Sequence, residues 1–216
     1  HRVVAFIAEM SARHGYIAQA LDLGGGMGIR YVESDDPLDV ADMAHRLRSI
    51  VVSECAAAGV PVPHLSVEPG RAIVGSSTVT VYEVGVVKPV QVSDDFSRQY
   101  IAVDGGMSDN IRTALYDADY TVALASRTST AAGVPSRVVG KHCESGDIVV
   151  KNADLPADIH AGDLLAVATT GAYCYAMSSN YNNLPRPAVV AVREGRSRVL
   201  VRRESVDDLL ARDADA

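Results

Sequence analysis

Residues 78–87, TVTVYEVGVV, decide the fold of the chain, because the spacing of the apolar side chains changes there. Upstream, apolar residues recur at helical intervals, whereas Val79, Val81 and Val84 begin a pattern typical of strands. Further runs suited to short strands follow at 100–103, 122–125, 138–139, 148–150 and 164–168, with a closing hairpin at 189–201 and a short helix at 207–212. The sequence therefore predicts an α/β region followed by an all-β region.

The α/β region alternates between helices and short strands. Val3, Phe6, Ile7 and Met10 predict the apolar face of a first helix, and Asp36 can cap a second one. Short strands are expected at 20–23 and 64–67. This alternation predicts parallel strands, and in such folds the chemistry gathers at the C-terminal ends of the strands.

The composition is that of a globular protein, with 48% hydrophobic and 22% charged residues among 216. A net charge of −7 argues against a nucleic-acid partner, which would need clustered Lys and Arg. Three cysteines without paired spacing favour a reducing, cytoplasmic environment over a disulfide scaffold or a metal site. No apolar run reaches the roughly 18 residues of a membrane span, so no membrane association is expected.

Two loops that follow the expected strands suit an anionic ligand. Gly24-Gly25-Gly26 lets bare backbone N–H groups approach a phosphate, although a tight turn without a ligand is an equal alternative. Glu68-Pro69-Gly70-Arg71 places an acid and a guanidinium around a Pro-Gly turn. The acid could keep a heterocyclic nitrogen protonated while the Arg binds a phosphate or carboxylate, but an ordinary ion pair explains the same residues.

The all-β region contains further candidates. Arg112 and Tyr116 lie one helical turn apart and could grip a carboxylate together, although Arg112 equally suits a surface. Cys143 has ionisable neighbours and could donate a proton or act as a nucleophile, with an inert buried thiol as the alternative. Tyr173 follows a glycine turn, where its phenol could contact an anion or pack half-buried.

Taken in order, these blocks resemble the signature motifs of the fold-type III pyridoxal-phosphate decarboxylases. The blocks are Leu21–Gly28, Glu68–Arg71, Ile111–Tyr116, Cys143–Ser145 and Gly171–Tyr173. A further block, Met177–Asn182 with Arg186-Pro187, is similar to that of the diaminopimelate decarboxylase branch. The chain departs from the commoner pattern at Thr113, at Lys141-His142 and at Cys174, and none of these departures removes a functional group.

The resemblance implies a fold in two parts. Residues 1–76 would be the C-terminal portion of a TIM-type (β/α)8 barrel that binds pyridoxal 5′-phosphate. Residues 77–216 would form a C-terminal β-barrel domain like that of alanine racemase. The boundary implied near Ser76 or Ser77 coincides with the change of period at residues 78–87.

The resemblance also implies roles for single residues. Gly24, Gly25 and Gly26 would bind the cofactor phosphate; Glu68 would face the pyridine nitrogen; and Pro69, Gly70 and Arg71 would complete that contact, with Arg71 also near the substrate. Arg112, Tyr116, Glu144 and Tyr173 match substrate contacts, and Tyr173 also matches a cofactor contact. Cys143 matches the general acid that returns a proton to the substrate carbon.

The activity implied is decarboxylation of meso-2,6-diaminopimelate to L-lysine and CO2 in a homodimer with shared active sites. The lysine that would form a Schiff base with the cofactor has no counterpart, since the chain contains only Lys88, Lys141 and Lys151, all in the all-β region. The chain also lacks an initiator Met and is already helical in pattern at Val3. We expect it to begin inside a larger fold and to be inactive alone.

Two alternatives stay open at this point. One is a related decarboxylase acting on ornithine, arginine or a carboxylated polyamine, which the distal carboxylate contacts expected of Arg112, Tyr116 and Glu144 argue against. The other is a non-catalytic module that retains the fold, which the missing lysine permits.

Overall fold

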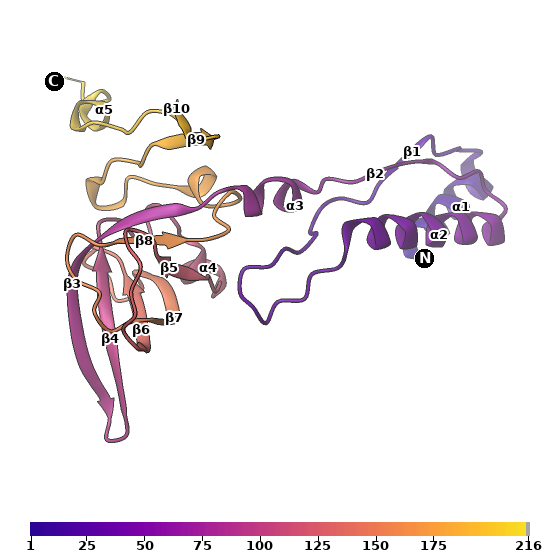
Figure 1. Ribbon diagram of the computed structural model, residues 1–216. Helices are drawn as coiled ribbons and strands as arrows, with labels where there is room; N and C mark the ends of the chain where they lie inside the picture. Colours follow the sequence, from indigo (N-terminus) through magenta and orange to yellow (C-terminus); the bar gives the residue numbers. More distant parts are fainter. Residues whose placement is uncertain (215–216) are drawn as a thin grey trace. The chain divides into compact units, whose positions relative to one another are not determined.

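The computed structural model describes residues 1–214, which divide into two compact units. The first unit comprises residues 1–30 and 34–74, and the second comprises residues 31–33 and the chain from Gly75 onward. Figure 1 follows the chain from the indigo N-terminal helix to the yellow C-terminal one. Each unit has a hydrophobic core of its own, so each is a separate packing unit.

The first unit contains helices and one parallel pair of strands. Its elements are α1 (Arg2–His14), β1 (Ala20–Asp22), α2 (Val40–Ala58), β2 (His64–Ser66) and α3 (Gly70–Val74). β1 and β2 pair in parallel with Leu21 opposite Leu65, and α2 supplies the crossover that parallel strands need. The small core consists of Val4, Ile7, Ala18, Leu21, Val51 and Cys55.

The apolar face expected for α1 is partly wrong. Val4 and Ile7 are buried, whereas Val3 and Phe6 are exposed. Successive residues of a helix are about 100° apart, so a face centred on Val4 and Ile7 turns Val3 and Phe6 away from the core. The helix ends at Gly15, which has the left-handed conformation.

The start expected for α2 is also wrong, because Asp39 caps the helix instead of Asp36. The Asp39 carboxylate accepts hydrogen bonds from the backbone N–H groups of Ala41 and Asp42, and the helix begins at Val40. Asp39 has an extended backbone conformation and lies immediately before the first turn of the helix, so its carboxylate can accept from the N–H groups of that turn. Gly59 ends the helix in the left-handed conformation.

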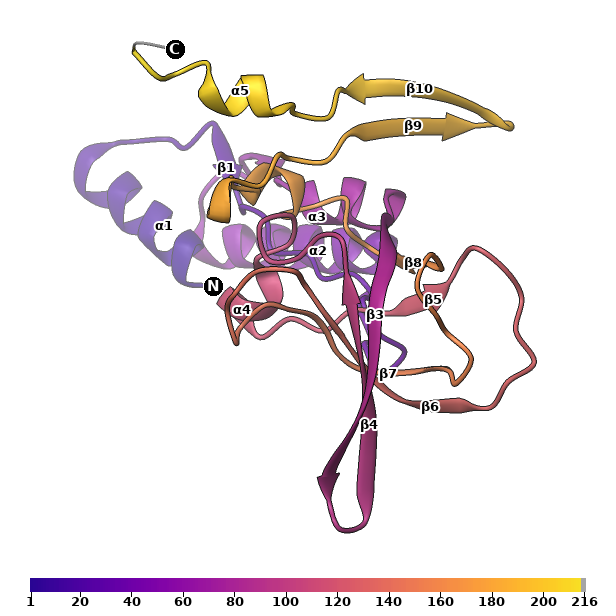
Figure 2. The ribbon, with the colours of Figure 1, turned by 90° about the vertical axis from the view of Figure 1, so that its left-hand side faces the viewer.

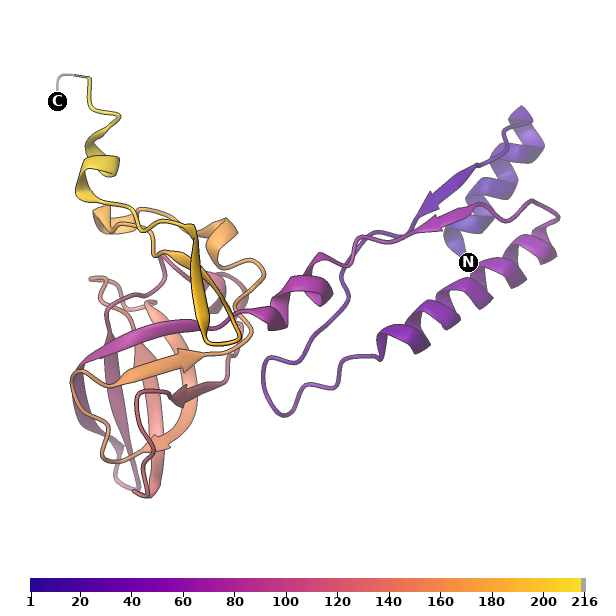
Figure 3. The ribbon, with the colours of Figure 1, turned by 45° about the horizontal axis from the view of Figure 1, so that its top comes forward.

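The second unit is built on a six-stranded sheet with the order β5-β8-β3-β4-β6-β7. The strands are β3 (Thr80–Ser93), β4 (Phe96–Val103), β5 (Val122–Leu124), β6 (Gly133–Val139), β7 (Ile148–Pro156) and β8 (Leu164–Val167). β4 and β6 are parallel, and the other pairs are antiparallel. The outermost strands β5 and β7 contact each other, so the sheet curls into a mostly closed barrel (Figure 3).

The core of this barrel consists largely of residues from the apolar runs that the sequence predicts to be strands. Ile101, Val138 and Leu165 are fully buried on three different strands. β3 and β4 extend further than expected, and Figure 2 shows their hairpin reaching beyond the other strands. The extension carries mostly polar, exposed residues, so backbone pairing rather than burial defines it.

Short elements connect and follow the barrel. They are a 3-10 turn η1 (Gly75–Ser77), helix α4 (Arg112–Tyr116), 3-10 turns η2 (Tyr175–Met177) and η3 (Tyr181–Asn183), strands β9 (Val189–Arg193) and β10 (Arg196–Val201), and helix α5 (Val206–Leu210). The expected hairpin is confirmed, with Glu194 and Gly195 both at positive φ in its two-residue turn. No helix within residues 1–214 combines the length and the apolar character needed to cross a bilayer.

Candidate active site

The glycine loop and the Glu68 loop lie side by side in the first unit. They follow β1 and β2, whose parallel pairing brings both C-terminal ends to the same edge. The backbone N–H of Glu68 donates to the carbonyl oxygen of Gly24 at 2.8 Å. Asp22 fixes the beginning of the loop, since its carboxylate accepts from Gly24 N at 2.7 Å and from Ser66 Oγ at 3.0 Å.

Close approach and backbone conformation explain why this loop is made of glycine. A Cβ on Gly25 would lie 2.5 Å from the carbonyl oxygen of Glu68, so no side chain fits there. Gly24 and Gly26 have φ values of 71° and 90°, which side chains rarely adopt. The loop therefore presents backbone N–H groups without side chains, as an anion site requires.

The Glu68 block differs from the isolated turn that the sequence suggested. Pro69 leads directly into α3, which begins at Gly70 and contains Arg71. Glu68 is exposed and Arg71 is half-buried. An acid and a guanidinium thus flank the same strand edge as the glycine loop, and both are fixed by short secondary structure.

Arg112, in the second unit, is a buried cation surrounded by aromatic rings. Its guanidinium carbon lies 4.7 Å from the ring centre of Tyr31, 5.7 Å from that of Tyr120 and 6.0 Å from that of Tyr173. Nη1 of Arg112 donates to the Tyr120 hydroxyl at 2.7 Å. Burial lowers the pKa of Arg112, but Tyr120, Tyr31 and Cys174 together raise it by more, so the guanidinium stays charged.

Tyr120 and Cys174 complete the surroundings of Arg112 as neutral groups. Burial raises the pKa of the Tyr120 phenol, and the nearby Cys174 thiol raises it further. Burial likewise raises the pKa of Cys174, whose sulfur lies 3.6 Å from the Tyr120 oxygen. Sequence reasoning missed both tyrosines, because Tyr31 is distant from Arg112 along the chain, and Tyr120, eight residues after Arg112, lies beyond the end of α4 and so matches no helical spacing.

The other expected substrate contacts of this unit are exposed. Tyr116 follows Arg112 by one turn of α4 and is 61% exposed, and Tyr173 is 45% exposed. Cys143 and Glu144 occupy the exposed tip of a loop between β6 and β7. Arg112 and Tyr173 are thus brought together, while Cys143 and Glu144 belong to a separate loop. No cluster of three potential metal ligands occurs within residues 1–214.

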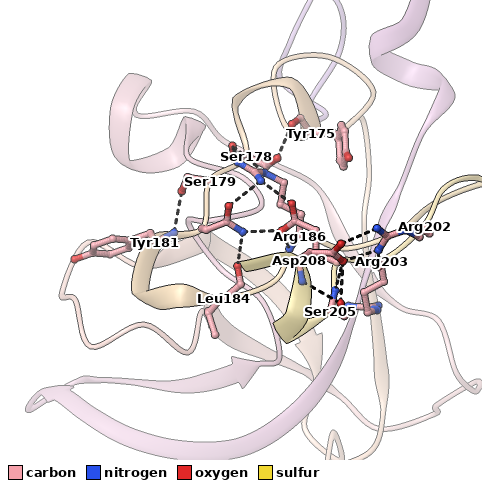
Figure 4. Close-up of polar contacts among 12 residues, drawn as sticks. Tyr175, Ser178, Ser179, Tyr181, Leu184, Arg186, Arg202, Arg203, Ser205 and Asp208 are labelled. Atoms are coloured by element: carbon pink, nitrogen blue, oxygen red, sulfur yellow. Dashed lines mark hydrogen bonds and ion pairs between the residues drawn. The ribbon is translucent and has the colours of Figure 1, made fainter. Parts of the chain in front are cut away.

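The block Met177–Asn182 is held by a polar network that the sequence did not reveal (Figure 4). Glu204 accepts from Arg186 Nη1 at 2.7 Å, from the Arg186 backbone N–H at 2.8 Å and from Asn180 Nδ2 at 2.7 Å. The Arg186 backbone N–H and the Asn180 amide lower the pKa of Glu204, which stays ionised. Arg186 and Asn180 are therefore structural members of the motif.

Comparison with known proteins identifies the family to which the chain belongs. Residues 16–171 match the family described as pyridoxal-dependent decarboxylase, C-terminal sheet domain. The chain belongs to this pyridoxal-dependent decarboxylase family, which confirms the resemblance drawn from the motif blocks and the expected β-barrel.

Within the family, the similar proteins include diaminopimelate decarboxylases. That of Mycobacterium tuberculosis (strain H37Rv) is 56% identical over 215 residues, covering 98% of this chain and 48% of the relative. That of Bacillus subtilis (strain 168) is 44% identical, covering 95% and 46%. The crystal structure of the M. jannaschii enzyme in complex with L-lysine has a TM-score of 0.87 at 27% identity, covering 98% of this chain and 46% of that one. The chain spans about half the length of the curated relatives it matches.

Proposed function

We propose that the chain is part of an enzyme that decarboxylates meso-diaminopimelate to L-lysine and CO2 with pyridoxal phosphate. The observation that carries the proposal is the 56% identity to a diaminopimelate decarboxylase across 98% of this chain. The motif residues are also present in the order that the resemblance implies. The complete enzyme would consist of this chain joined to the N-terminal half that its relatives carry.

The strand edge of the first unit fits the cofactor. The loop of Gly24, Gly25 and Gly26 would hold the phosphate through the backbone N–H groups of Gly25 and Gly26, since that of Gly24 donates to Asp22 and no side chain fits at Gly25. Glu68, beside this loop, would keep a proton on the pyridine nitrogen, and Arg71 would add a positive charge near the phosphate or substrate. Pyridoxal phosphate supplies, when bound, an electron sink for the bond that releases CO2.

The second unit would supply the substrate contacts and the proton. Arg112 is a fixed cation suited to a carboxylate. Two exposed phenols accompany it: Tyr116 is one helical turn away in the chain, and the Tyr173 ring is close to the guanidinium in space. Glu144 would bind an ammonium group, so the set suits a molecule with an amino and a carboxyl group at each end. Cys143, an exposed thiol, would return a proton to the substrate carbon after CO2 leaves.

The same proposal includes architecture and assembly. Residues 1–76 would be the C-terminal portion of the cofactor-binding α/β barrel, and residues 77–216 the β-barrel domain. The enzyme would be a cytoplasmic homodimer in which the exposed loop of Cys143 and Glu144 reaches into the partner's site. The lysine that anchors the cofactor would lie in the N-terminal half, since Lys88, Lys141 and Lys151 are all in the second unit.

The direct test is CO2 release from meso-diaminopimelate by the complete enzyme with cofactor, with ornithine as the comparison substrate. We expect turnover of diaminopimelate and little turnover of ornithine, which has no distal carboxylate for Arg112. No release from diaminopimelate would refute the proposed activity, and preferential turnover of ornithine would refute the proposed substrate.

Two substitutions test the assigned roles. Cys143→Ala should lower kcat by about 10²-fold or more while leaving the cofactor absorbance unchanged, because a general acid typically contributes that much. Glu68→Gln should lower the rate because the ring nitrogen loses its proton-holding partner. Cys55→Ala is the matched control for the thiol, since Cys55 is buried in the core of the first unit. An unchanged kcat in Cys143→Ala would remove that thiol from the proton-donor role.

A further inference from the structure

A buried histidine–aspartate pair closes the base of the loop that carries Cys143. Nδ1 of His142 lies 2.7 Å from Oδ2 of Asp147, and the two side chains are 0% and 1% exposed. Between them, Cys143, Glu144 and Ser145 are exposed. The loop therefore has a buried base, formed by His142 and Asp147, and an exposed tip, formed by residues 143–145. The position of the base determines where the tip lies.

Asp147 makes most of the contacts at this buried base. Its carboxylate also accepts from the backbone N–H of Met107 at 2.6 Å and from that of His142 at 2.8 Å. The carboxylate therefore ties the loop after β6 to the loop after β4. A buried carboxylate with three N–H donors has its charge well satisfied and its position restricted.

Glycines make room for the pair. A Cβ on Gly106 would lie 2.5 Å from Oδ1 of Asp147 and 2.7 Å from Nδ1 of His142, and a Cβ on Gly140 would overlap the same carboxylate. The glycines at 106 and 140 are thus explained by the space that Asp147 and His142 occupy. A side chain at either position would displace the pair.

The imidazole of His142 is also held from its face. The ring of Tyr181 stacks on it with centres 5.4 Å apart and planes 9° apart. Tyr181 follows Asn180, which Glu204 and Arg186 fix in the network of Figure 4. Nε2 of His142 has no hydrogen-bond partner within residues 1–214, so Asp147 and Tyr181 define the orientation of the ring.

We propose that His142 and Asp147 are positioning residues for Cys143 and Glu144, with the Nδ1–H of His142 donating to Asp147. The importance of this position for catalysis rests on the proposed function, in which Cys143 donates the proton. The Asp147 carboxylate accepts from the backbone N–H of His142, so the pair fixes the backbone at the start of the tip as well as the two side chains. Backbone bonds from Glu144 N to His142 O and from Asp147 N to Glu144 O connect the tip to these two residues. Loss of the pair frees the tip without removing any group that contacts substrate.

The test compares His142→Ala with His142→Asn in the complete enzyme, because the Asn amide can replace the Nδ1–H donor while Ala cannot. Hydrogen exchange of the backbone amides at 141–148 and 104–108 is measured in both. We expect exchange in His142→Ala to be faster by about tenfold or more at both segments, with unchanged exchange in β8. His142→Asn should restore most of the protection. The control is His160→Ala, whose ring is 67% exposed.

Kinetics supply a second readout that simple loss of packing would not reproduce. His142→Ala should lower kcat by about ten- to a hundredfold with cofactor absorbance unchanged, since small displacements of a reacting group have effects of that size. His142→Asn should recover kcat together with the protection. Equal exchange in Ala, Asn and parent proteins would overturn the positioning role, whatever the activity. Absence of any decarboxylation in the parent would instead refute the proposed function and leave the exchange result decisive.

Discussion

Arg112 shows how one side chain can be held in place by neutral groups. Its guanidinium lies over the Tyr31 ring and donates one hydrogen bond to Tyr120. Ring contacts restrain the plane of the group, and the hydrogen bond restrains its rotation within that plane. Arg112 forms no ion pair with a carboxylate within residues 1–214, so its charge is available to a ligand, which is the property that the proposed substrate contact requires.

Removal of the Tyr120 hydroxyl should therefore affect the fold as well as the site. We expect Tyr120→Phe to lower the free energy of unfolding by about 1–2 kcal/mol, because a buried N–H of Arg112 loses its acceptor. Urea unfolding measures the change. Tyr175→Phe is the control, since Tyr175 is 41% exposed and should change stability by less than about 0.5 kcal/mol. Equal stability of Tyr120→Phe and the parent would contradict the importance of this bond.

Among the elements, the sequence predicted the buried parts of the strands better than their ends. The apolar run at 100–103 lies in β4, and β8 covers the run at 164–168 except for its last residue, because alternating burial imposes a period of two. The extension of β3 to Ser93 left no such pattern, since its outer residues are exposed and only backbone pairing orders them. The start of α2 was misplaced because Asp36 and Asp39 both suit a cap by residue type.

The candidate site was predictable as a set of residue types but not as a set of contacts. The motif blocks supplied Glu68, Arg112 and Cys143, because loops after strands are visible in one sequence. The neighbours Tyr31 and Glu204 emerged from the structure alone, since each meets its partner through the fold rather than through spacing. His142 and Asp147 are only five residues apart, yet nothing in the sequence indicates that they turn inward.

The end of β5 and the start of β8 are joined by the carboxylate of Asp163. It accepts from Arg127 Nε and Nη2 at 2.9 Å each, from Ser126 Oγ at 3.0 Å and from the His160 N–H at 3.1 Å. The Arg127 guanidinium holds the pKa of Asp163 well below its usual value of 3.8. A carboxyl with a lowered pKa stabilises the folded state above the unfolded pKa, and this contribution is lost as the pH falls through the folded pKa.

Asp163→Asn should consequently destabilise the protein most at neutral pH. We expect the free energy of unfolding to fall by about 1.5–3 kcal/mol at pH 7, because hydrogen bonds to a charged group are lost. Below about pH 4 the parent loses part of the same contribution, so the difference in stability between the two proteins should become smaller. Denaturant unfolding at pH 7 and pH 3 checks this, with exposed Asp95→Asn as the control. A difference independent of pH would show that packing, not ionisation, is responsible.

At the scale of the whole molecule, the proposed site residues are divided between the two units. The glycine loop, Glu68 and Arg71 belong to the first unit, whereas Arg112, Cys143, Glu144 and Tyr173 belong to the second. The proposed homodimer would complete each site with the Cys143 loop of the partner. Such sharing has a consequence that a self-contained site lacks, because two defects on different chains can then fall in the same site and leave the other site intact.

Mixed dimers of the complete enzyme test this sharing. One subunit carries Cys143→Ala and the other Glu68→Gln, each nearly inactive as a homodimer. In a shared arrangement, one site of the mixed dimer receives both defects and the other receives neither. Random reassortment makes half of the dimers mixed, so we expect about one quarter of the parent activity. If each site were built within a single chain, the mixed dimers would recover no activity. The control is a mixture of Cys143→Ala with Glu144→Gln, which should stay inactive. Both changes lie on the same loop, so no site of these mixed dimers receives an unaltered loop.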